Sequence, residues 1–197
     1  MSQQGATDAE LIIDVLKGRE AAFTALMRRH KTWLYLFVRR HVRTPEDAYD
    51  VVQESFTSAW GALKRYDPER PFEIWLRRIA LNKCRDRARR ESVRRRAFSL
   101  VGLAPEAAEQ VADTAPGAEA ASIGGEALRR LNAALAALPL KLREPLILTA
   151  LQGLSQREAA EVLGVTPKVV EMRAYRARKQ LADTLQPSDF EDLERIG

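Results

Sequence analysis

The sequence predicts an all-α protein made of two small helical domains joined by a flexible acidic linker, with a helix-turn-helix in the C-terminal domain. Apolar residues recur at helical spacing through most of the 197 residues, and no useful stretch alternates with the period of a strand. Residues 97–125 contain four acids, no Lys or Arg, and many Ala, Gly and Pro, a composition typical of a linker. Residues 154–181 contain two helix-start signals separated by a glycine.

Charge divides the chain in the same way. Residues 1–96 hold 21 Lys and Arg against 13 Asp and Glu, and residues 126–185 hold ten against six. The tail, residues 186–197, has one base and four acids. We therefore expect a first basic domain over 1–96, the linker over 97–125, a second basic domain over 126–185 and an acidic tail. Two basic domains suit two contacts with a polyanion, although solvated surfaces alone can also be basic.

Four helices are expected in the first domain, over residues 8–17, 19–42, 44–63 and 72–96. The third has a start signal at Thr44, and the prolines of residues 66–71 separate it from the fourth. Apolar residues at helical spacing are predicted to form the core: Leu11, Ile12, Val15, Leu16, Phe23, Leu26, Met27, Trp33, Leu34, Phe37, Val52, Phe56, Ala59, Trp60, Leu63, Phe72, Trp75, Leu76 and Ile79.

The second domain is expected to begin with helices over 128–138 and 141–152. Ser155 and Glu158 form a capping box that starts a further helix, which Gly164 ends. Thr166 and Pro167 then start a basic helix, in which Val170, Ala174, Ala177 and Leu181 form the buried stripe. This pattern predicts a helix-turn-helix whose second helix enters a DNA major groove. The alternative is an ordinary helical hairpin with a solvated basic face.

Two surfaces of the first domain stand out by charge. Residues 77–96 hold ten bases and two acids, a density that favours phosphate or single-stranded nucleic acid over a merely solvated helix. Trp75 beside them is either a core residue or a base-stacking one. The helix over 44–63 instead carries an acidic face. Charge complementarity at a helix N-terminus explains only its first two acids, so docking to a basic protein surface is the stronger interpretation.

The sequence gives no support for several other classes of protein. Cys84 is the only cysteine, and His30 and His41 lie outside any ligand-spaced motif, so we expect no disulfide, metal or other cofactor. No glycine-rich phosphate loop and no catalytic constellation occur, so we expect neither an enzyme nor a small-molecule substrate. Residues 1–11 do not resemble a secretory signal and no apolar run could cross a bilayer, which favours a cytoplasmic protein.

Five short segments together resemble the extracytoplasmic-function (ECF, group 4) sigma factors of bacterial RNA polymerase. They are DAYDVVQESFTSAW (47–60), FEIWLRRIALN (72–82), LPLKLR (138–143) and LSQREAAEVLGV (154–165) with YRARKQL (175–181). The likeness covers about residues 8–96 and 126–185. Within it, Val169-Val170-Glu171-Met172 departs from the commonest family form, T-V-K-S. Glu171 stands where the common form has a lysine, so one phosphate contact is lost. The carboxylate of Glu171 suits a cytosine amino group instead.

The resemblance implies a non-catalytic initiation factor with core RNA polymerase and promoter DNA as partners, and an anti-sigma factor that holds it, at the membrane or in solution. Polymerase docking would fall to Asp47, Asp50, Gln53 and Glu54. Recognition and melting of the −10 element would fall to Arg65 and its loop, Trp75, Arg78, Asn82, Arg85 and Arg89. Reading of the −35 element would fall to Ser155, Thr166, Lys168, Glu171, Arg173, Tyr175, Arg176 and Arg178.

Two rival functions are a helix-turn-helix regulator that acts without polymerase, and a nucleic-acid-processing enzyme with a DNA-binding tail. The acidic face and the Asn82-bearing helix disfavour the first. The second would require carboxylates clustered with His or Cys, which the sequence does not offer.

Overall fold

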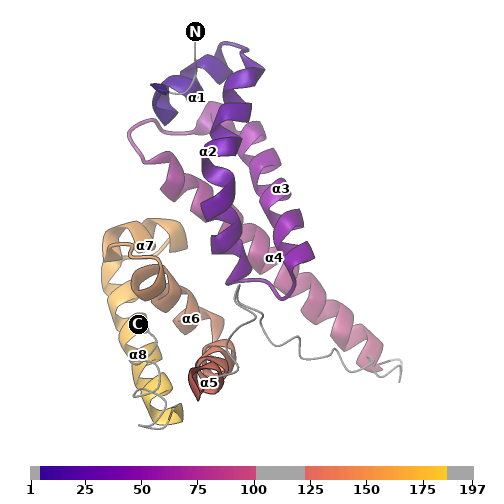
Figure 1. Cartoon of the computed structure of the whole chain (residues 1–197), viewed down its shortest axis with the longest axis vertical. Helices are drawn as coiled ribbons and strands as arrows, with labels where there is room; N and C mark the ends of the chain where they lie inside the picture. The colour runs from indigo at the N-terminus through magenta and orange to yellow at the C-terminus, as the bar shows by residue number, and fades with distance from the viewer. Residues whose placement is uncertain (1–4, 101–122, 186–197) are drawn as a thin grey trace. The chain divides into compact units, whose positions relative to one another are not determined.

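The computed structural model describes residues 5–100 and 123–185 (Figure 1). Every regular element within these two ranges is helical, which confirms the all-α prediction. The chain divides into two compact units, residues 1–109 and 110–197. Residues 101–122, in which most of the predicted linker falls, and the acidic tail lie outside the described residues. Within the described ranges no helix is both long enough and apolar enough to span a membrane.

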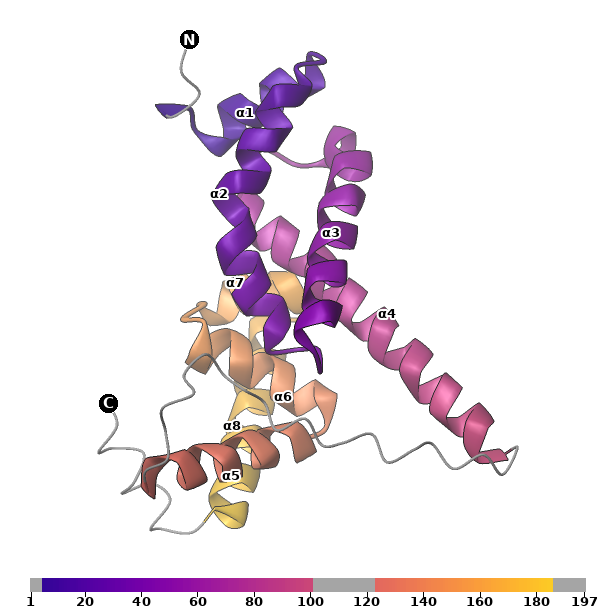
Figure 2. The ribbon, with the colours of Figure 1, turned by 45° about the vertical axis from the view of Figure 1, so that its right-hand side comes forward.

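The first unit is a bundle of four α-helices. α1 (Asp8–Leu16) packs on α2 (Glu20–Arg39), α2 packs on α3 (Pro45–Ala62), and α3 packs on α4 (Phe72–Leu100). Figure 2 shows α2 and α3 side by side. A short 3₁₀ turn, η2 (Leu63–Arg65), follows α3 and also contacts α1. The loop over residues 66–71 therefore begins beside α1 and ends at the first residue of α4.

Side-chain caps start two of these helices where the sequence predicts a start. The hydroxyl of Thr44 accepts a hydrogen bond from the backbone N–H of Asp47 at 3.1 Å, and Pro45 occupies the first turn of α3. Thr7 and Glu10 form a complete capping box at α1. The hydrogen bonds from Thr7 to Glu10 lower the pKa of the Glu10 carboxyl. These local interactions satisfy backbone N–H groups that a helix leaves without partners.

Three residues predicted to be core are largely exposed. Leu16, Met27 and Trp60 retain 50%, 37% and 42% of their accessible surface. Leu16 is the last residue of α1, and the ring of Trp60 packs on that of Phe23, with 4.8 Å between their centroids. In a small bundle, the face of a helix that neighbouring helices cover is narrower than the face that its apolar residues occupy. Apolar residues at the edges of that face therefore stay in contact with water.

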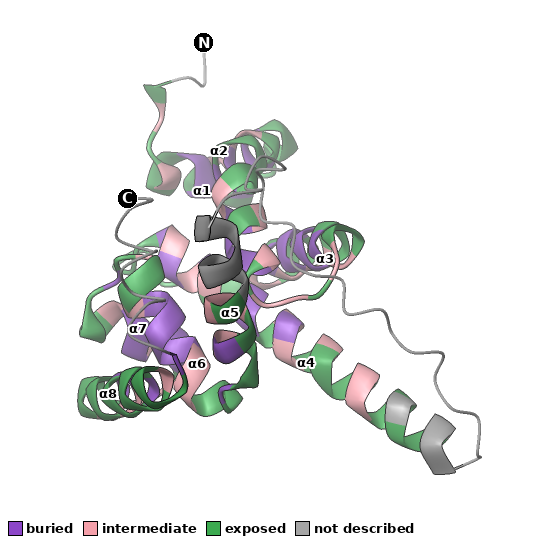
Figure 3. Ribbon diagram, turned by 60° about the horizontal axis from the view of Figure 1, so that its bottom comes forward, coloured by how far each residue is buried: buried purple, intermediate pink, exposed green. Residues whose placement is uncertain are grey.

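α4 continues beyond the packed part of its bundle. It reaches Leu100, past residue 96, and Cys84 is its last buried residue among those whose burial is described. Figure 3 shows the helix passing from buried toward mostly exposed surface along its length. Between Arg85 and Arg94 no apolar side chain is buried, so apolar packing does not hold this part of α4. Its exposed charged surface is available to solvent or to a partner.

The second unit holds α5 (Ile123–Ala137), α6 (Leu140–Leu146), the π-helical turn η3 (Ile147–Leu151), α7 (Gln156–Leu163) and α8 (Pro167–Thr184). The helix predicted over 141–152 thus changes register at Ile147. Pro145 lies just before this turn, and its carbonyl accepts a hydrogen bond from the hydroxyl of Thr149 at 2.8 Å. At the end of the π turn the backbone N–H of Gln152 donates to the carbonyl of Ile147, five residues back, at 3.1 Å.

Arg143 supports this unit from inside. Burial lowers the pKa of its guanidinium, while the carboxylate of neighbouring Glu144 acts in the opposite sense. The guanidinium donates to the backbone carbonyl of Ala136 in α5 at 3.3 Å, so it ties α6 to α5. The arginine of the motif near the start of the domain therefore has a structural role.

The helix-turn-helix forms with the predicted caps. Ser155 and Glu158 make a complete capping box at α7, and the hydroxyl of Thr166 accepts from the N–H of Val169 at the start of α8. Val170, Ala174 and Ala177 are buried. Between the helices Gly164 takes a left-handed conformation, with φ 69° and ψ 38°. A side chain at this position would strain the turn that sets the angle between α7 and α8.

We expect Gly164→Ala to destabilise the second unit by about 1–2 kcal/mol, because a residue with a Cβ is disfavoured at positive φ. Urea unfolding followed by circular dichroism measures the loss. Gly61→Ala is the matched control, because Gly61 lies in α3 and an added Cβ would meet nothing within 4 Å. The control should be neutral or slightly stabilising. Equal destabilisation by both changes would contradict a conformational role for Gly164.

Candidate nucleic-acid and protein interfaces

The predicted acidic face lies on α3, but its four members differ in exposure. The Asp47 side chain is only 16% exposed, whereas that of Asp50 is 62% exposed. Gln53 is exposed and Glu54 is half-buried. Asp50, Gln53 and Glu54 therefore present polar groups to a partner, and Asp47 presents little.

Arg87 of α4 explains the burial of Asp47. Its guanidinium forms an ion pair with Asp47 and contacts the carboxylate of Asp50 at 3.4 Å. Burial alone would lower the pKa of Arg87, but the charges and hydrogen bonds of the two carboxylates raise its pKa above the ordinary value. Asp47 and Arg87 thus join α3 to α4. Arg87 is one of the ten bases counted over residues 77–96, and its contacts with the two carboxylates engage it inside the bundle.

An aromatic pair that sequence reasoning did not single out joins α2 to α3 beside the acidic face. The rings of Tyr35 in α2 and Tyr49 in α3 lie 4.8 Å apart, and Tyr49 is 57% exposed. Tyr49 directly precedes Asp50, so the acidic face has an apolar neighbour. An aromatic residue off the buried stripe of an amphipathic helix is the sequence signal that could have indicated it.

The basic row of α4 is exposed over much of its length. The row consists of Arg78, Asn82, Arg85 and Arg89, at intervals of four, three and four residues; Arg85 is half-buried and the other three are exposed. The guanidinium of Arg85 donates to the side-chain carbonyl of Asn82 at 3.3 Å. This bond orients the amide of Asn82 and leaves its two N–H groups to donate to a ligand.

Arg77, another of the ten bases over residues 77–96, lies outside this row. It forms an ion pair with Glu73, and its guanidinium lies over the ring of Trp33, 4.6 Å from the centroid. Its side chain is only 11% exposed. Arg77 therefore fastens α4 to α2, as Arg87 fastens α4 to α3. A bundle of short helices uses the long stems of arginine as packing surface.

An aromatic cluster lies where the loop over residues 66–71 meets α4. The ring of Tyr66 lies 5.8 Å from that of Phe72 and 5.1 Å from that of Trp75. Trp75 is half-buried in this cluster, while Arg65 just before the loop is exposed. The Tyr66 hydroxyl also donates to the backbone carbonyl of Arg70. Both ends of the loop thus rest on one aromatic support, and residues 67–71 remain exposed.

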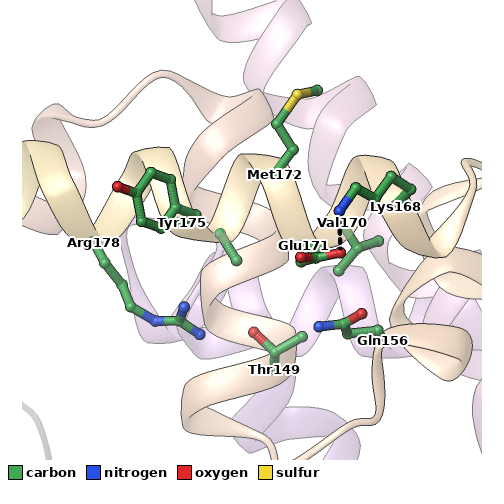
Figure 4. A pocket seen from close by; sticks show the side chains of 9 residues that line it. Thr149, Gln156, Lys168, Val170, Glu171, Met172, Tyr175 and Arg178 are labelled. Carbon is green, nitrogen blue, oxygen red and sulfur yellow. Dashed lines mark hydrogen bonds and ion pairs between the residues drawn. The ribbon is translucent and has the colours of Figure 1, made fainter.

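A hollow of about 400 Å³ lies along α8 (Figure 4). Four residues predicted to bind DNA line it: Lys168, Glu171, Tyr175 and Arg178. Thr149 of η3 and Gln156 of α7 face them from the opposite side, and sequence reasoning missed both. Lys168 and Glu171 form an ion pair of 2.9 Å, so Glu171 is partly neutralised before any ligand arrives.

The other four residues predicted for α7 and α8 do not line this hollow. The hydroxyls of Ser155 and Thr166 are engaged as helix caps, so they hold the motif together. Arg176 is exposed and Arg173 is half-buried, and neither lines the hollow. α8 therefore offers a polar hollow on one side and an arginine-bearing surface beside it.

Among the residues that the structure describes, no group of three or more His, Cys, Asp or Glu could hold a metal ion. The described surfaces of the two units offer charged groups, hydrogen-bonding groups and aromatic faces to a partner. A cationic row with an oriented amide suits nucleic acid, and an acidic face with an exposed tyrosine suits a protein.

Comparisons with known proteins agree with this arrangement. Residues 26–111 match the family description Sigma-70 region 2, and residues 128–181 match Sigma-70, region 4. The RNA polymerase sigma factor CnrH of Cupriavidus metallidurans is 41% identical over 179 residues, which cover 90% of this chain and 94% of that protein. The ECF RNA polymerase sigma factor SigM of Mycobacterium tuberculosis is 34% identical, over 91% of this chain and 85% of the relative.

Two solved structures share the fold. The structure of CnrH in complex with the cytosolic domain of CnrY superposes with a TM-score of 0.62, at 35% identity, and covers 89% of this chain and 95% of that one. The sigma factor RpoE of Bartonella quintana, in complex with the anti-sigma factor NepR, gives a TM-score of 0.64 at 23% identity, over 82% of this chain and 95% of that one. The second likeness concerns the fold alone.

Proposed function

The chain belongs to the ECF type of the sigma-70 family, and from this premise we propose that it directs core RNA polymerase to promoters through a −10 and a −35 element. It would be an alternative sigma factor with no chemistry of its own. The observation that carries the proposal is the division of the first unit between an exposed acidic face on α3 and an exposed cationic row on α4. One unit could thereby contact a protein and a nucleic acid at once.

For polymerase docking we propose Asp50, Gln53 and Glu54, with Tyr49 beside them. Their exposure supports this assignment, and the burial of Asp47 against Arg87 argues for a structural role of Asp47 instead. Charges at an interface steer association and select the partner, while an aromatic side chain supplies buried area.

For the −10 element we propose the loop over 66–71 with Arg65, Trp75, Arg78, Asn82, Arg85 and Arg89. The exposed arginines can pair with phosphates, and the N–H groups of Asn82 can donate to an unstacked base. The aromatic support of the loop favours capture of a base that has left the duplex. Strand separation would then be driven by binding energy.

For the −35 element we propose α8 in a major groove. Lys168, Glu171, Tyr175 and Arg178 surround the hollow, and Arg173 and Arg176 lie outside it. The ion pair of Glu171 with Lys168 limits how freely Glu171 can accept from a cytosine amino group. The caps of Ser155 and Thr166 make their contribution to DNA binding indirect.

We also propose that an anti-sigma factor controls the chain. Support comes from CnrH, which was solved with the cytosolic domain of another protein, CnrY. A membrane-anchored partner of this kind would hold the chain at the inner face of the membrane, in the cytoplasm.

Specific promoter binding should require core polymerase. Each unit is small, and single DNA-binding modules bury only about 600–1,000 Å² of protein surface, so neither unit is expected to bind tightly alone. An electrophoretic mobility shift at physiological salt, with and without core polymerase, measures this dependence. A scrambled promoter of the same length is the control. Tight and promoter-specific binding by the free protein would contradict the proposal and favour a conventional regulator.

A further inference from the structure

His30 is a buried histidine that none of the proposed interfaces uses. It is 5% exposed in α2, and three neighbours surround its ring. Its Nε2 lies 2.8 Å from a carboxylate oxygen of Asp8, and its Nδ1 accepts from the indole N–H of Trp33 at 2.8 Å. Its ring lies 5.1 Å from that of Phe72. These contacts come from α1, from α2 and from the first residue of α4.

The hydrogen bonds determine the tautomer of His30. The indole N–H of Trp33 can only donate, so Nδ1 carries no proton and accepts. The proton of the neutral ring is then on Nε2, which donates to Asp8. The other oxygen of Asp8 accepts from Arg29 at 2.6 Å, so the carboxylate is held on both sides. The ring is consequently fixed in position and in rotation.

From His30 the contacts continue to the loop over residues 66–71. Phe72 is 3% exposed, directly follows the loop, and lies 5.6 Å from the ring of Trp75. Tyr66 packs on both rings and donates to the carbonyl of Arg70. Burial, followed by the charges of Asp8 and Asp67, raises the pKa of Tyr66, so its hydroxyl remains a donor. A continuous path of contacts therefore joins α1 to both ends of the loop.

We propose that His30, held between Asp8 and Trp33, is a positioning residue that fixes Phe72 and thereby the loop that captures the −10 base. This inference rests on the proposed function of the loop. Reactive or binding groups on a loop need supporting contacts that fix their geometry, and an offset of about 1 Å can cost as much as a hundredfold in rate. α1, which carries none of the predicted DNA contacts, would thus contribute to promoter opening.

The test compares His30→Leu with His30→Gln in holoenzyme formed with core polymerase, on a promoter that the wild-type holoenzyme transcribes. Leucine fills the space but pairs with neither Asp8 nor Trp33, whereas the amide of glutamine can donate to one and accept from the other. Permanganate reactivity of −10 thymines reports opening, and filter binding reports the closed complex. We expect His30→Leu to lower opening about tenfold or more, with closed-complex binding within about twofold of wild type, and His30→Gln to restore most of the opening.

Val51→Ala separates positioning from general instability. Val51 is 1% exposed on α3 and takes no part in the path from Asp8 to Arg70. It should lower the melting temperature of the free protein without a selective loss of opening. Equal loss of opening in His30→Leu and Val51→Ala at matched stability would overturn the inference, as would normal opening in His30→Leu. Failure of the wild-type holoenzyme to open any promoter would instead refute the proposed function of the loop.

Discussion

Reversing the charges of Asp50 and Glu54 together is expected to weaken binding to core RNA polymerase by about a hundredfold or more, because breaking interfacial charge pairs costs about 2–5 kcal/mol. Neither carboxylate belongs to the buried stripe of α3, so the fold should persist. Asp50→Lys removes one contact of Arg87, but Asp47 still pairs with that guanidinium. Co-purification with tagged core polymerase measures the loss, and circular dichroism checks the fold.

The matched control reverses Glu20 and Asp183, which are exposed on α2 and α8. It changes the net charge of the protein by the same amount and leaves α3 untouched. We expect this control to bind core polymerase normally. A protein with Asp50→Lys and Glu54→Lys that still co-purifies at wild-type yield would refute the docking role of α3. Asp47→Lys is not a suitable probe, since it would put a second cation against Arg87 and destabilise the bundle.

Asn82→Ala and Arg176→Ala are expected to fail at different steps of initiation. Loss of Asn82 should impair opening of the −10 region and largely preserve the closed complex, because its amide would act on an unstacked base. Loss of Arg176 should weaken the closed complex by about 1–3 kcal/mol if the contact is direct and bidentate. The Arg176→Ala protein should also depend more strongly on a good match to the −10 element. Filter binding and permanganate footprinting on one promoter separate the two steps.

Two further variants sharpen this comparison. Asn82→Asp keeps an acceptor for Arg85 but has no N–H to donate, so it should open the promoter as poorly as Asn82→Ala. Lys141→Ala removes an exposed cation from α6 and should leave closed-complex binding nearly unchanged, in contrast to Arg176→Ala. If Asn82→Ala and Arg176→Ala lose binding and opening in equal proportion, the proposed division of labour between the two units is wrong.

Features set by local sequence could be predicted well. The capping box of Ser155 and Glu158, the cap at Thr166 and the left-handed Gly164 each depend on residues within a few positions, so the sequence alone indicated the helix-turn-helix. The register change at Ile147 was not predicted. A proline near the end of a helix indicates that the helix is interrupted, but it does not show whether a π turn, a 3₁₀ turn or a loop follows.

Features that depend on tertiary contact could not be predicted. Arg87 meets Asp47 from forty positions away, and Asp8 meets His30 from 22 positions away. Arg77 and Arg87 were counted only within the ten bases of residues 77–96, because composition cannot show which arginines turn toward neighbouring helices. The exposure of Trp60 could not be predicted either, because it depends on which parts of the neighbouring helices cover the side chain. The hollow along α8 needs Thr149 and Gln156 from two other elements.

Reconstituted transcription tests the central claim most directly, that this chain gives core polymerase its promoter choice. Core enzyme free of sigma factors would be incubated with fragmented genomic DNA of the source organism, with and without the protein, and the 5′ ends of the transcripts sequenced. The account predicts discrete 5′ ends that appear only with the protein and share two upstream sequence elements. Identical transcripts from core enzyme alone and from core enzyme with the protein would contradict it.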